Sequence, residues 1–199
     1  MKKGRLIVIS GPSGVGKGTV VKALLERDPR VRLSVSATTR QMRPNEIDGV
    51  HYYFLSHEKF ASMIAEDRFL EHAEYVGNCY GTPEEPVNRM LEEGYDVILE
   101  IEVQGGLQVM QRRPEAISIF ITAPSFEILG NRLRGRGDTD EEKVLKRLQQ
   151  ARVEYRVAPK YQYIILNDRI EDAVSDIQAV LRAEALKSEQ QQHLLKEAN

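Results

Sequence analysis

The chain of 199 residues has room for one domain, or for one core with small inserted subdomains. Its hydrophobic fraction of 41% supports a packed core and argues against global disorder. The net charge of −2 excludes a general electrostatic attraction to nucleic acid or to anionic lipid, so any anion-binding site must be local.

Five short, nearly continuous apolar runs mark the predicted strands. Such runs are typical of parallel strands that are buried on both faces. Helical patterns separate them, which indicates an α/β fold with a parallel sheet. The predicted strands are residues 5–10, 33–37, 96–101, 117–122 and 161–166.

Capping signals and apolar spacing set the predicted helices. The first begins at the Gly16–Lys17 turn and fades at Asp28–Pro29, and Gly94 ends the second. The other helices follow capping residues, namely Ser125, Thr139 with Glu142, and Asp168 with Glu171. The predicted helices cover about residues 17–28, 84–93, 126–133, 143–155 and 170–181.

The pattern changes between Ala37 and Pro83. Asp48–Gly49 predicts a tight turn, and residues 50–55 form a short aromatic run. We expect an inserted antiparallel unit here rather than another βαβ step. A second departure from the pattern is a charged helical excursion around residues 125–157.

Residues 10–20, SGPSGVGKGTV, nearly match the phosphate-binding pattern G-x-x-x-x-G-K-[ST]. The glycines let the backbone turn tightly and direct N–H groups at phosphate oxygens, and Lys17 adds a positive charge. A glycine-rich turn with a solvated lysine is the alternative, but the full spacing between a strand and a helix favours a phosphate loop. The expected ATP-binding residues of this loop are Gly11, Pro12, Ser13, Gly14, Val15, Gly16, Lys17, Gly18 and Thr19.

Gly18 stands where most such loops carry a hydroxyl, which here arrives one residue later at Thr19. Magnesium bound to ATP can take its ligands from phosphate oxygens and water, because it gives up its waters reluctantly. A hydroxyl ligand is therefore dispensable. The form GKGT is similar to the loops of nucleoside monophosphate kinases and less similar to those of GTPases.

Arg40 and Arg43 follow a predicted strand in a turn-rich segment that ends at Pro44. Two arginines three residues apart can hold one phosphate, because a guanidinium group matches pairs of phosphate oxygens. Taken alone, such arginines are more often solvated surface residues, so the surrounding pattern must decide.

That pattern consists of four further motifs in order: SVSATTRQMRPNEIDGVHYYF at 34–54, FLEHAEYVGNCYGT at 69–82, VILEIEVQGG at 97–106 and RLRGRG at 132–137. Together they resemble guanylate kinases, which transfer phosphate from ATP to GMP. The resemblance covers about residues 5–182. It implies a P-loop NTPase-like five-stranded parallel sheet flanked by helices, with an inserted mixed β/α GMP-binding subdomain and a helical lid.

The resemblance also divides the chain. Residues 1–34, 84–124 and 158–199 would form the P-loop core, residues 35–83 the GMP-binding subdomain and residues 125–157 the lid. It implies two small-molecule substrates, ATP and GMP, and Mg²⁺ bound as Mg·ATP, mainly through the nucleotide and water. No metal held by the protein itself is expected.

The GMP site implied by the resemblance has a base-reading part and a phosphate-holding part. A carboxylate such as Glu71 can accept both the N1–H and the N2–H₂ of guanine, whereas adenine presents a bare acceptor, so such a site rejects the wrong base. The residues implied for guanine are Ser36, Glu71 and Thr82, and those for the phosphate are Arg40, Arg43, Tyr52 and Tyr80. Glu100 is also assigned to GMP, although contact with guanine, with a metal-bound water or with neither stays open for Glu100 and Glu102.

Phosphoryl transfer needs neutralisation of charge on the moving group and exclusion of water. By the resemblance, the lid arginines close over the ATP phosphates, and Asn167 contacts the adenine. A charged, solvated helix pair is the alternative reading of the lid. The expected catalytic residues are Lys17, Arg40, Arg132, Arg136 and Arg147.

Two rival functions are weighed against a GMP kinase. The loop alone would permit a kinase of another monophosphate such as AMP, but Glu71 and the segment around Arg40 argue against it. A catalytically dead guanylate-kinase-like binding module is the second rival, and the intact Gly16–Lys17 loop argues against it.

The cellular setting follows from three features. One cysteine, Cys79, fits a reducing compartment, the longest apolar run is too short to span a bilayer, and the N-terminus lacks a signal-peptide pattern. We therefore expect a cytoplasmic protein, monomeric or homodimeric, without nucleic-acid or membrane partners.

Overall fold

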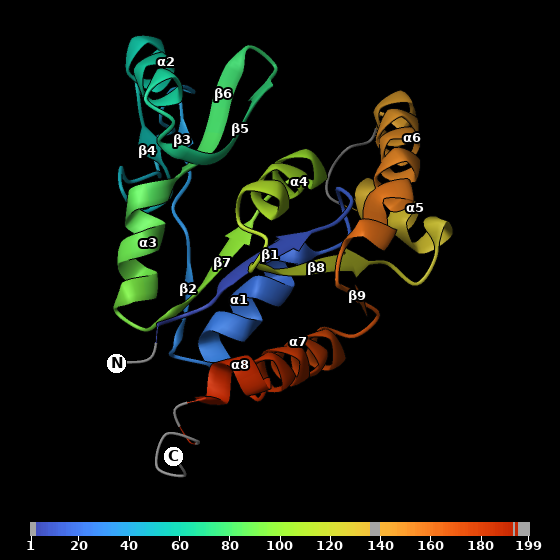
Figure 1. Cartoon of the computed structure of the whole chain (residues 1–199). Coiled ribbons are helices and arrows are strands. Elements are labelled where there is room, and N and C mark those ends of the chain that lie inside the picture. Colours follow the sequence, from blue (N-terminus) through green and yellow to red (C-terminus); the bar gives the residue numbers. More distant parts are fainter. Residues whose placement is uncertain (1–2, 136–139, 193, 195–199) are drawn as a thin grey trace.

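The computed structural model describes residues 3–135, 140–192 and 194. Two sheets are present in this part of the chain (Figure 1): one with the strand order β2-β7-β1-β8-β9, the other with the order β4-β3-β6-β5. All pairs in the five-stranded sheet are parallel. The fold is therefore the α/β arrangement that the apolar runs predict.

Strand β1 (Leu6–Ser10) lies at the centre of the five-stranded sheet. Its side chains alternate between two hydrophobic clusters, with Ile7 and Ile9 in one and Leu6 and Val8 in the other. The strand is thus buried on both faces, which explains its unbroken apolar sequence. The other strands of this sheet are β2 (Val31–Leu33), β7 (Asp96–Glu100), β8 (Ile117–Thr122) and β9 (Tyr163–Leu166).

Helices cover both faces of the sheet. The cluster of Ile7 takes its helical members from α1 (Lys17–Arg27), α5 (Phe126–Arg134), α6 (Glu141–Val157) and α7 (Ile170–Ala185). The cluster of Leu6 includes residues of α3 (Glu84–Glu92), α4 (Val103–Arg112) and the 3₁₀ turn η1 (Ala158–Lys160). A short α8 (Ser188–Gln191) follows α7. Among the described residues, no helix has the length and apolar character needed to cross a membrane.

The predicted strand over residues 33–37 is wrong, because the chain changes sheet there. β2 ends at Leu33, and the next strand, β3 (Ala37–Thr38), belongs to the four-stranded sheet. A bond from the Ser34 N–H to the Ile98 carbonyl, 2.9 Å long, still holds the chain to the core sheet just before it departs. A change of pairing partner ends the strand, and the local apolar pattern carries no sign of it.

The four-stranded sheet is mixed rather than wholly antiparallel. β3 and β5 each pair antiparallel with β6, but β3 and β4 are parallel. Residues 39–52 form a connection long enough to carry the chain back before β4 begins. Gly49 has a φ of 75° within this connection, as a tight turn requires. The remaining elements are β4 (Tyr53–Phe54), α2 (His57–Ala65), β5 (Phe69–Tyr75) and β6 (Asn78–Pro83).

Helices α2 and α4 are absent from the sequence prediction. The Ser56 hydroxyl caps α2 by accepting from the Lys59 N–H at 3.1 Å, a signal that the sequence does contain. α4 includes Gly105 and Gly106, which lower helix propensity. Tertiary contacts therefore decide that this glycine-containing segment is helical.

Two predicted helix caps differ from the structure. The Asp140 side chain caps α6 by accepting from the Glu142 N–H at 3.1 Å, while the expected cap Thr139 lies outside the described residues. Arg169, not Asp168, occupies the N-cap position of α7, and no side chain bonds the first turn. The expected cap at Asp168 is wrong, because α7 begins one residue later than that cap requires.

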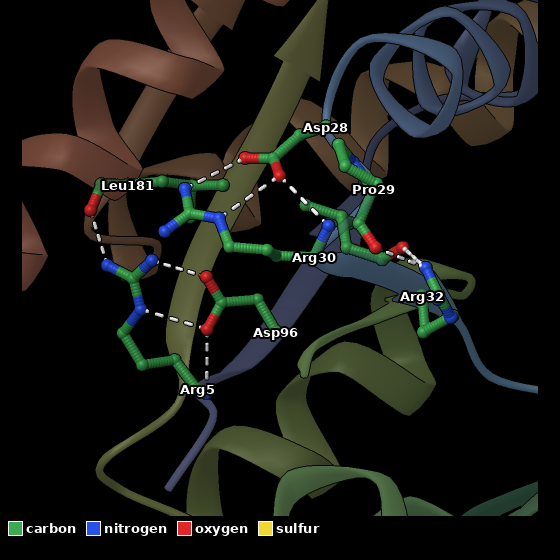
Figure 2. A network of polar contacts seen from close by, with 8 residues as sticks. Arg5, Asp28, Pro29, Arg30, Arg32, Asp96 and Leu181 are labelled. Carbon is green, nitrogen blue, oxygen red and sulfur yellow. Dashed lines mark hydrogen bonds and ion pairs between the residues drawn. The ribbon is translucent and has the colours of Figure 1, made fainter. Parts of the chain in front are cut away.

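A partly buried ion pair joins the amino ends of β1 and β7 (Figure 2). The backbone N–H and the Nε of Arg5 donate to Asp96 Oδ1 at 2.9 and 3.0 Å, and its guanidinium also bonds Asp96 Oδ2 and the Leu181 carbonyl. Asp96 opens β7, and Leu181 belongs to α7. The neighbouring pair Asp28–Arg30 closes the turn after α1. These contacts lie at the edge of the sheet opposite the phosphate loop.

The substitution Asp96→Ala should lower the free energy of unfolding by about 2 kcal/mol, because it leaves the partly buried Arg5 guanidinium without its carboxylate partner. Urea denaturation of purified protein measures this loss. Asp176→Ala on the exposed face of α7 is the control and should change little. Equal stability of the two variants would contradict the structural role of the pair.

Candidate active site

The predicted phosphate loop lies between β1 and α1, at the carboxyl edge of the parallel sheet. Gly11, Gly14 and Gly16 have φ values of 152°, 86° and 95°, which favour glycine. A Cβ on Gly11 would lie 2.3 Å from the Ile121 carbonyl oxygen. The loop backbone therefore needs glycine both for its conformation and for its close approach to β8.

Lys17, the first residue of α1, folds back over the loop. Its Nζ donates to the Gly11 carbonyl at 2.5 Å and lies 3.4 Å from the Pro12 carbonyl. The ammonium group thus lies over the loop backbone beside the positive end of α1. The structure thus brings the expected ATP-binding lysine to the predicted loop.

Two residues distant in sequence bond the Val15 carbonyl of the loop. Asn167, just after β9, donates from Nδ2 at 2.8 Å, and Arg132 of α5 donates from Nη1 at 3.2 Å. Asn167 is buried, and its Oδ1 has no hydrogen-bond partner within the described part of the chain. The structure thus brings Asn167 and Arg132 to the predicted loop.

Other loop residues have simpler surroundings. Pro12 is buried and Ser13 is half-buried, whereas Thr19 is exposed on the first turn of α1. The absent Cβ of Gly18 would lie 3.5 and 3.6 Å from the two carboxylate oxygens of Glu100. Glu100 ends β7, so the parallel pairing of β1 and β7 brings this carboxylate beside the loop.

A buried carboxylate lies on the four-stranded sheet. Glu71 is only 7% exposed, and its Oε1 accepts from the Thr82 hydroxyl at 2.7 Å. The two residues are direct partners in the antiparallel pair of β5 and β6. Burial raises the pKa of Glu71, and the hydrogen bond from Thr82 opposes this rise. Ser36 lies just before β3, half-buried, and its carbonyl accepts from the Tyr53 N–H.

Arg40 lies among several predicted phosphate-holding residues. Its guanidinium lies 5.4 Å from the centre of the Tyr52 ring, which contacts Tyr80 edge-on at 6.3 Å. Glu46 binds the same guanidinium through both oxygens, at 2.8 and 2.9 Å. Glu46 also accepts from the backbone N–H of Arg43, whose side chain is exposed.

Glu46 is a residue of this cluster that sequence reasoning missed. Its bonds to Arg40, and the further bond from the Arg43 backbone, lower its pKa to about 2. The six-residue spacing between Arg40 and Glu46 crosses a turn, so no helical or strand period indicates that the two side chains meet. A paired arginine is held in a defined orientation, which suits the recognition of an anion.

Glu154, on α6, was also missed. It is 7% exposed, and its Oε2 has no hydrogen-bond partner in the described part of the chain. Burial raises its pKa, Glu102 adds to the rise and Lys17 opposes it, so this carboxylate lies near the loop lysine. The sequence did contain one signal: Glu154 lies three residues after Ala151, so both fall on the buried face of α6.

The three arginines expected in the lid differ in where they lie. Arg132 reaches the loop, as described above. Arg147 lies exposed on α6, and Arg136 lies outside the described residues. Across the described ranges, no group of three or more His, Cys, Asp and Glu side chains lies close enough together to hold a metal ion.

Known proteins resemble this chain along nearly its whole length. A family profile described as Guanylate kinase matches residues 3–184. The guanylate kinase of Carboxydothermus hydrogenoformans is 52% identical over 187 residues, covering 94% of this chain and 92% of that protein. The guanylate kinase of Halalkalibacterium halodurans is 50% identical over 188 residues, covering 94% of this chain and 92% of that protein.

The structure also resembles solved structures of kinases. The guanylate kinase from Anaplasma phagocytophilum superposes with a TM-score of 0.77 at 34% identity, covering 98% of this chain and 95% of that one. A shikimate kinase from Bacteroides thetaiotaomicron, at 19% identity and a TM-score of 0.50, shares the fold alone. With its profile match and its relatives aligned along nearly their whole length, the chain belongs to the guanylate kinase family.

Proposed function

We propose that the protein transfers the γ-phosphoryl group of ATP to GMP, which yields ADP and GDP. Family membership and the two candidate anion-binding regions, around Lys17 and Arg40, support this proposal. The observation that carries it is the buried Glu71, held by Thr82 on the four-stranded sheet. Such a carboxylate matches the adjacent N1–H and N2–H₂ donors of guanine and repels the lone pair that adenine presents.

The phosphate loop is the proposed ATP site. Its backbone N–H groups and Lys17 would bind the β- and γ-phosphates, and Asn167 would contact the adenine through its unpartnered Oδ1. The whole set of proposed contacts is Gly11, Pro12, Ser13, Gly14, Val15, Gly16, Lys17, Gly18, Thr19 and Asn167.

The acceptor site is proposed on residues 35–83. Glu71, Thr82 and Ser36 would read guanine, and the cluster around Arg40 would hold the phosphate, with Glu46 fixing the guanidinium. The proposed phosphate contacts are Arg40, Arg43, Tyr52 and Tyr80. Residues 1–34, 84–124 and 158–199 would form the core, and residues 125–157 the lid.

Catalysis is proposed to depend on positioning and charge. Lys17 and Arg132 each bond a carbonyl of the loop. We assign them, with Arg40, Arg136 and Arg147, to stabilising the transferring phosphoryl group. A general base is unnecessary, since a phosphate monoester with a second pKa of about 6 already presents an anionic oxygen at neutral pH. This oxygen can attack the γ-phosphorus directly in line.

Magnesium fits the acidic side of this site. Mg²⁺ prefers oxygen ligands and keeps several waters, and the Glu100 carboxylate lies beside Gly18 at the start of α1. Bound with ATP, the ion would supply charge neutralisation at the phosphates. Glu100 would accept from a metal-bound water or from GMP, while nucleotide and water would provide most of the ligands.

A nucleotide panel tests the proposed function. Purified protein with ATP and Mg²⁺ is offered GMP, AMP, UMP or CMP, and ADP formation is followed. We expect turnover with GMP far above the other three, and loss of turnover when EDTA removes Mg²⁺. Preference for AMP would identify another monophosphate kinase, and no turnover at all would indicate a binding module.

Lys17→Met should lower kcat by about a thousandfold, because it removes a positive charge that stabilises the transferring group. Steady-state assays with GMP measure this loss. Lys22→Met on the exposed face of α1 is the matched control and should retain activity. An active Lys17→Met enzyme would refute the assigned role.

Glu71→Gln should reduce kcat/KM for GMP by about a hundredfold and leave ATP binding intact, since the amide cannot accept both guanine donors. Titration calorimetry with each nucleotide separates the two effects. Glu74→Gln, on the exposed face of the same strand, is the control. Equal losses for ATP and GMP would make Glu71 structural.

The same Glu71→Gln variant should become more heat-stable relative to the wild type as pH rises from 4.5 through the folded pKa of Glu71. The pKa of Glu71 is raised by folding from 4.5, so its stabilising contribution is full below 4.5 and is lost as pH rises through the folded value. Thermal melts at several pH values should show the difference between the proteins growing with pH. A difference independent of pH would contradict this linkage.

Glu46→Gln should raise KM for GMP about fivefold, because Arg40 loses the charged partner that orients it. The pKa of Glu46 is lowered from 4.5 to about 2, so its contribution to stability is present above 4.5 and is lost as pH falls towards 2. Acid melts of the wild type should show this loss and those of the variant should not. Glu92→Gln, exposed on α3, serves as the control.

A further inference from the structure

Helix α4 holds the outer strand of the four-stranded sheet through one side chain. β5 ends the strand order, with β6 as its strand neighbour among the described residues. The Gln108 side chain bonds the backbone of His72 twice: its Oε1 accepts from the His72 N–H at 3.2 Å, and its Nε2 donates to the His72 carbonyl at 3.0 Å. The amide thus supplies the donor and acceptor that a further strand would offer.

His72 directly follows Glu71, the proposed guanine reader. Gly105 lies three residues before Gln108, on the same face of α4, and its absent Cβ would lie 2.6 Å from Glu71 Oε2. α4 therefore contacts β5 at two successive residues, with Gly105 against the carboxylate and Gln108 on the backbone beside it. Any larger residue at Gly105 would displace the carboxylate.

The pairing of β5 with β6 is irregular just before this point. The register shifts between Phe69 and Glu71, and regular pairing begins with Glu71 opposite Thr82. A strand next to such an irregularity is less well fixed by its one neighbour. The contacts from α4 supply the second anchor at this position.

The same helix also leads to the proposed ATP site. Glu102, its N-cap, lies two residues after Glu100, whose carboxylate lies beside Gly18 of the phosphate loop. At the other end of α4, Arg112 bonds Asp67 at 2.6 and 2.9 Å and Glu84 at 3.0 Å. α4 therefore connects the strand of Glu71 to the loop of Lys17.

We propose that Gln108 is a positioning residue for base recognition: by clamping the backbone of His72, it fixes the Glu71 carboxylate where the N1–H and N2–H₂ of guanine are read. This inference rests on the proposed GMP phosphorylation and adds a specificity determinant outside the nucleotide contacts. The 2-amino group is the most sensitive probe, because inosine monophosphate lacks it and keeps N1–H. If the Glu71 carboxylate is free to shift, we expect it to lose its bond to the 2-amino group before its bond to N1–H.

The test compares Gln108→Met with Gln111→Met, the same change at an exposed position of the same helix. We expect the ratio of kcat/KM for GMP to that for inosine monophosphate to fall about tenfold in Gln108→Met, as loss of one good hydrogen bond implies. The ratio should stay unchanged in Gln111→Met, and KM for ATP should stay unchanged in both. Hydrogen exchange of the His72 amide should become faster in Gln108→Met alone.

The outcomes separate the two proposals. A wild type that makes no GDP overturns the proposed function, whereas a wild type that makes GDP with both variants equal in their nucleotide ratio overturns the role of Gln108. Equal losses with GMP, inosine monophosphate and ATP in Gln108→Met, together with a lower Tm, would also overturn it in favour of a purely structural role. If Gln108→Met does not fold, Gln108→Glu keeps the length and the acceptor but places a carboxylate against the His72 carbonyl, and the same fall in the ratio is expected.

Discussion

Parallel pairing of β1 with β7 on one side and β8 on the other brings the carboxyl ends of these strands to one edge of the sheet. The phosphate loop follows β1, Glu100 ends β7, and Asn167 follows β9, the strand beyond β8. A turn of glycines, a carboxylate and an amide therefore meet although they are separated by up to 152 residues. The start of α1 lies at the same edge, so strand direction itself brings the candidate anion site there.

The second half of the site depends on burial of charge. Glu71 and Glu154 are both 7% exposed, and burial raises the pKa of each. A fold selected only for stability would place apolar residues at such positions. Such positions suit sites that a ligand completes: the ligand proposed at Glu71 is guanine, whereas Glu154 lies near the charge of Lys17. The partly buried side chains of Arg40 and Glu46 instead neutralise each other in the proposed acceptor region.

Helix α4 lies next to both the proposed ATP site and the proposed GMP site. It begins beside the phosphate loop, contacts Glu71 through Gly105 and His72 through Gln108, and ends at the pairs of Arg112 with Asp67 and Glu84. Two substrates that react in line must be held within a few tenths of an ångström of the right separation. A helix is stiffer than the loops that join the two sheets, so it is suited to set that separation.

The sequence by itself determined the phosphate loop, four of the five core strands and most of the helices, because each has a local signal: glycine spacing, unbroken apolar runs or capping residues. The motif resemblance supplied the family and named Glu71, Thr82, Arg40 and Asn167, which the structure brings into contact with partners or with the loop. Only the tertiary structure decided that the chain changes sheet between Leu33 and Ala37 and that the glycine-containing α4 is helical. It also decided that Glu46 bonds Arg40, that Glu154 lies near Lys17 and that Gln108 bonds His72. The physical reason is that these features depend on contacts between residues distant in sequence or across irregular turns, where no period of 2 or 3.6 relates one partner to the other.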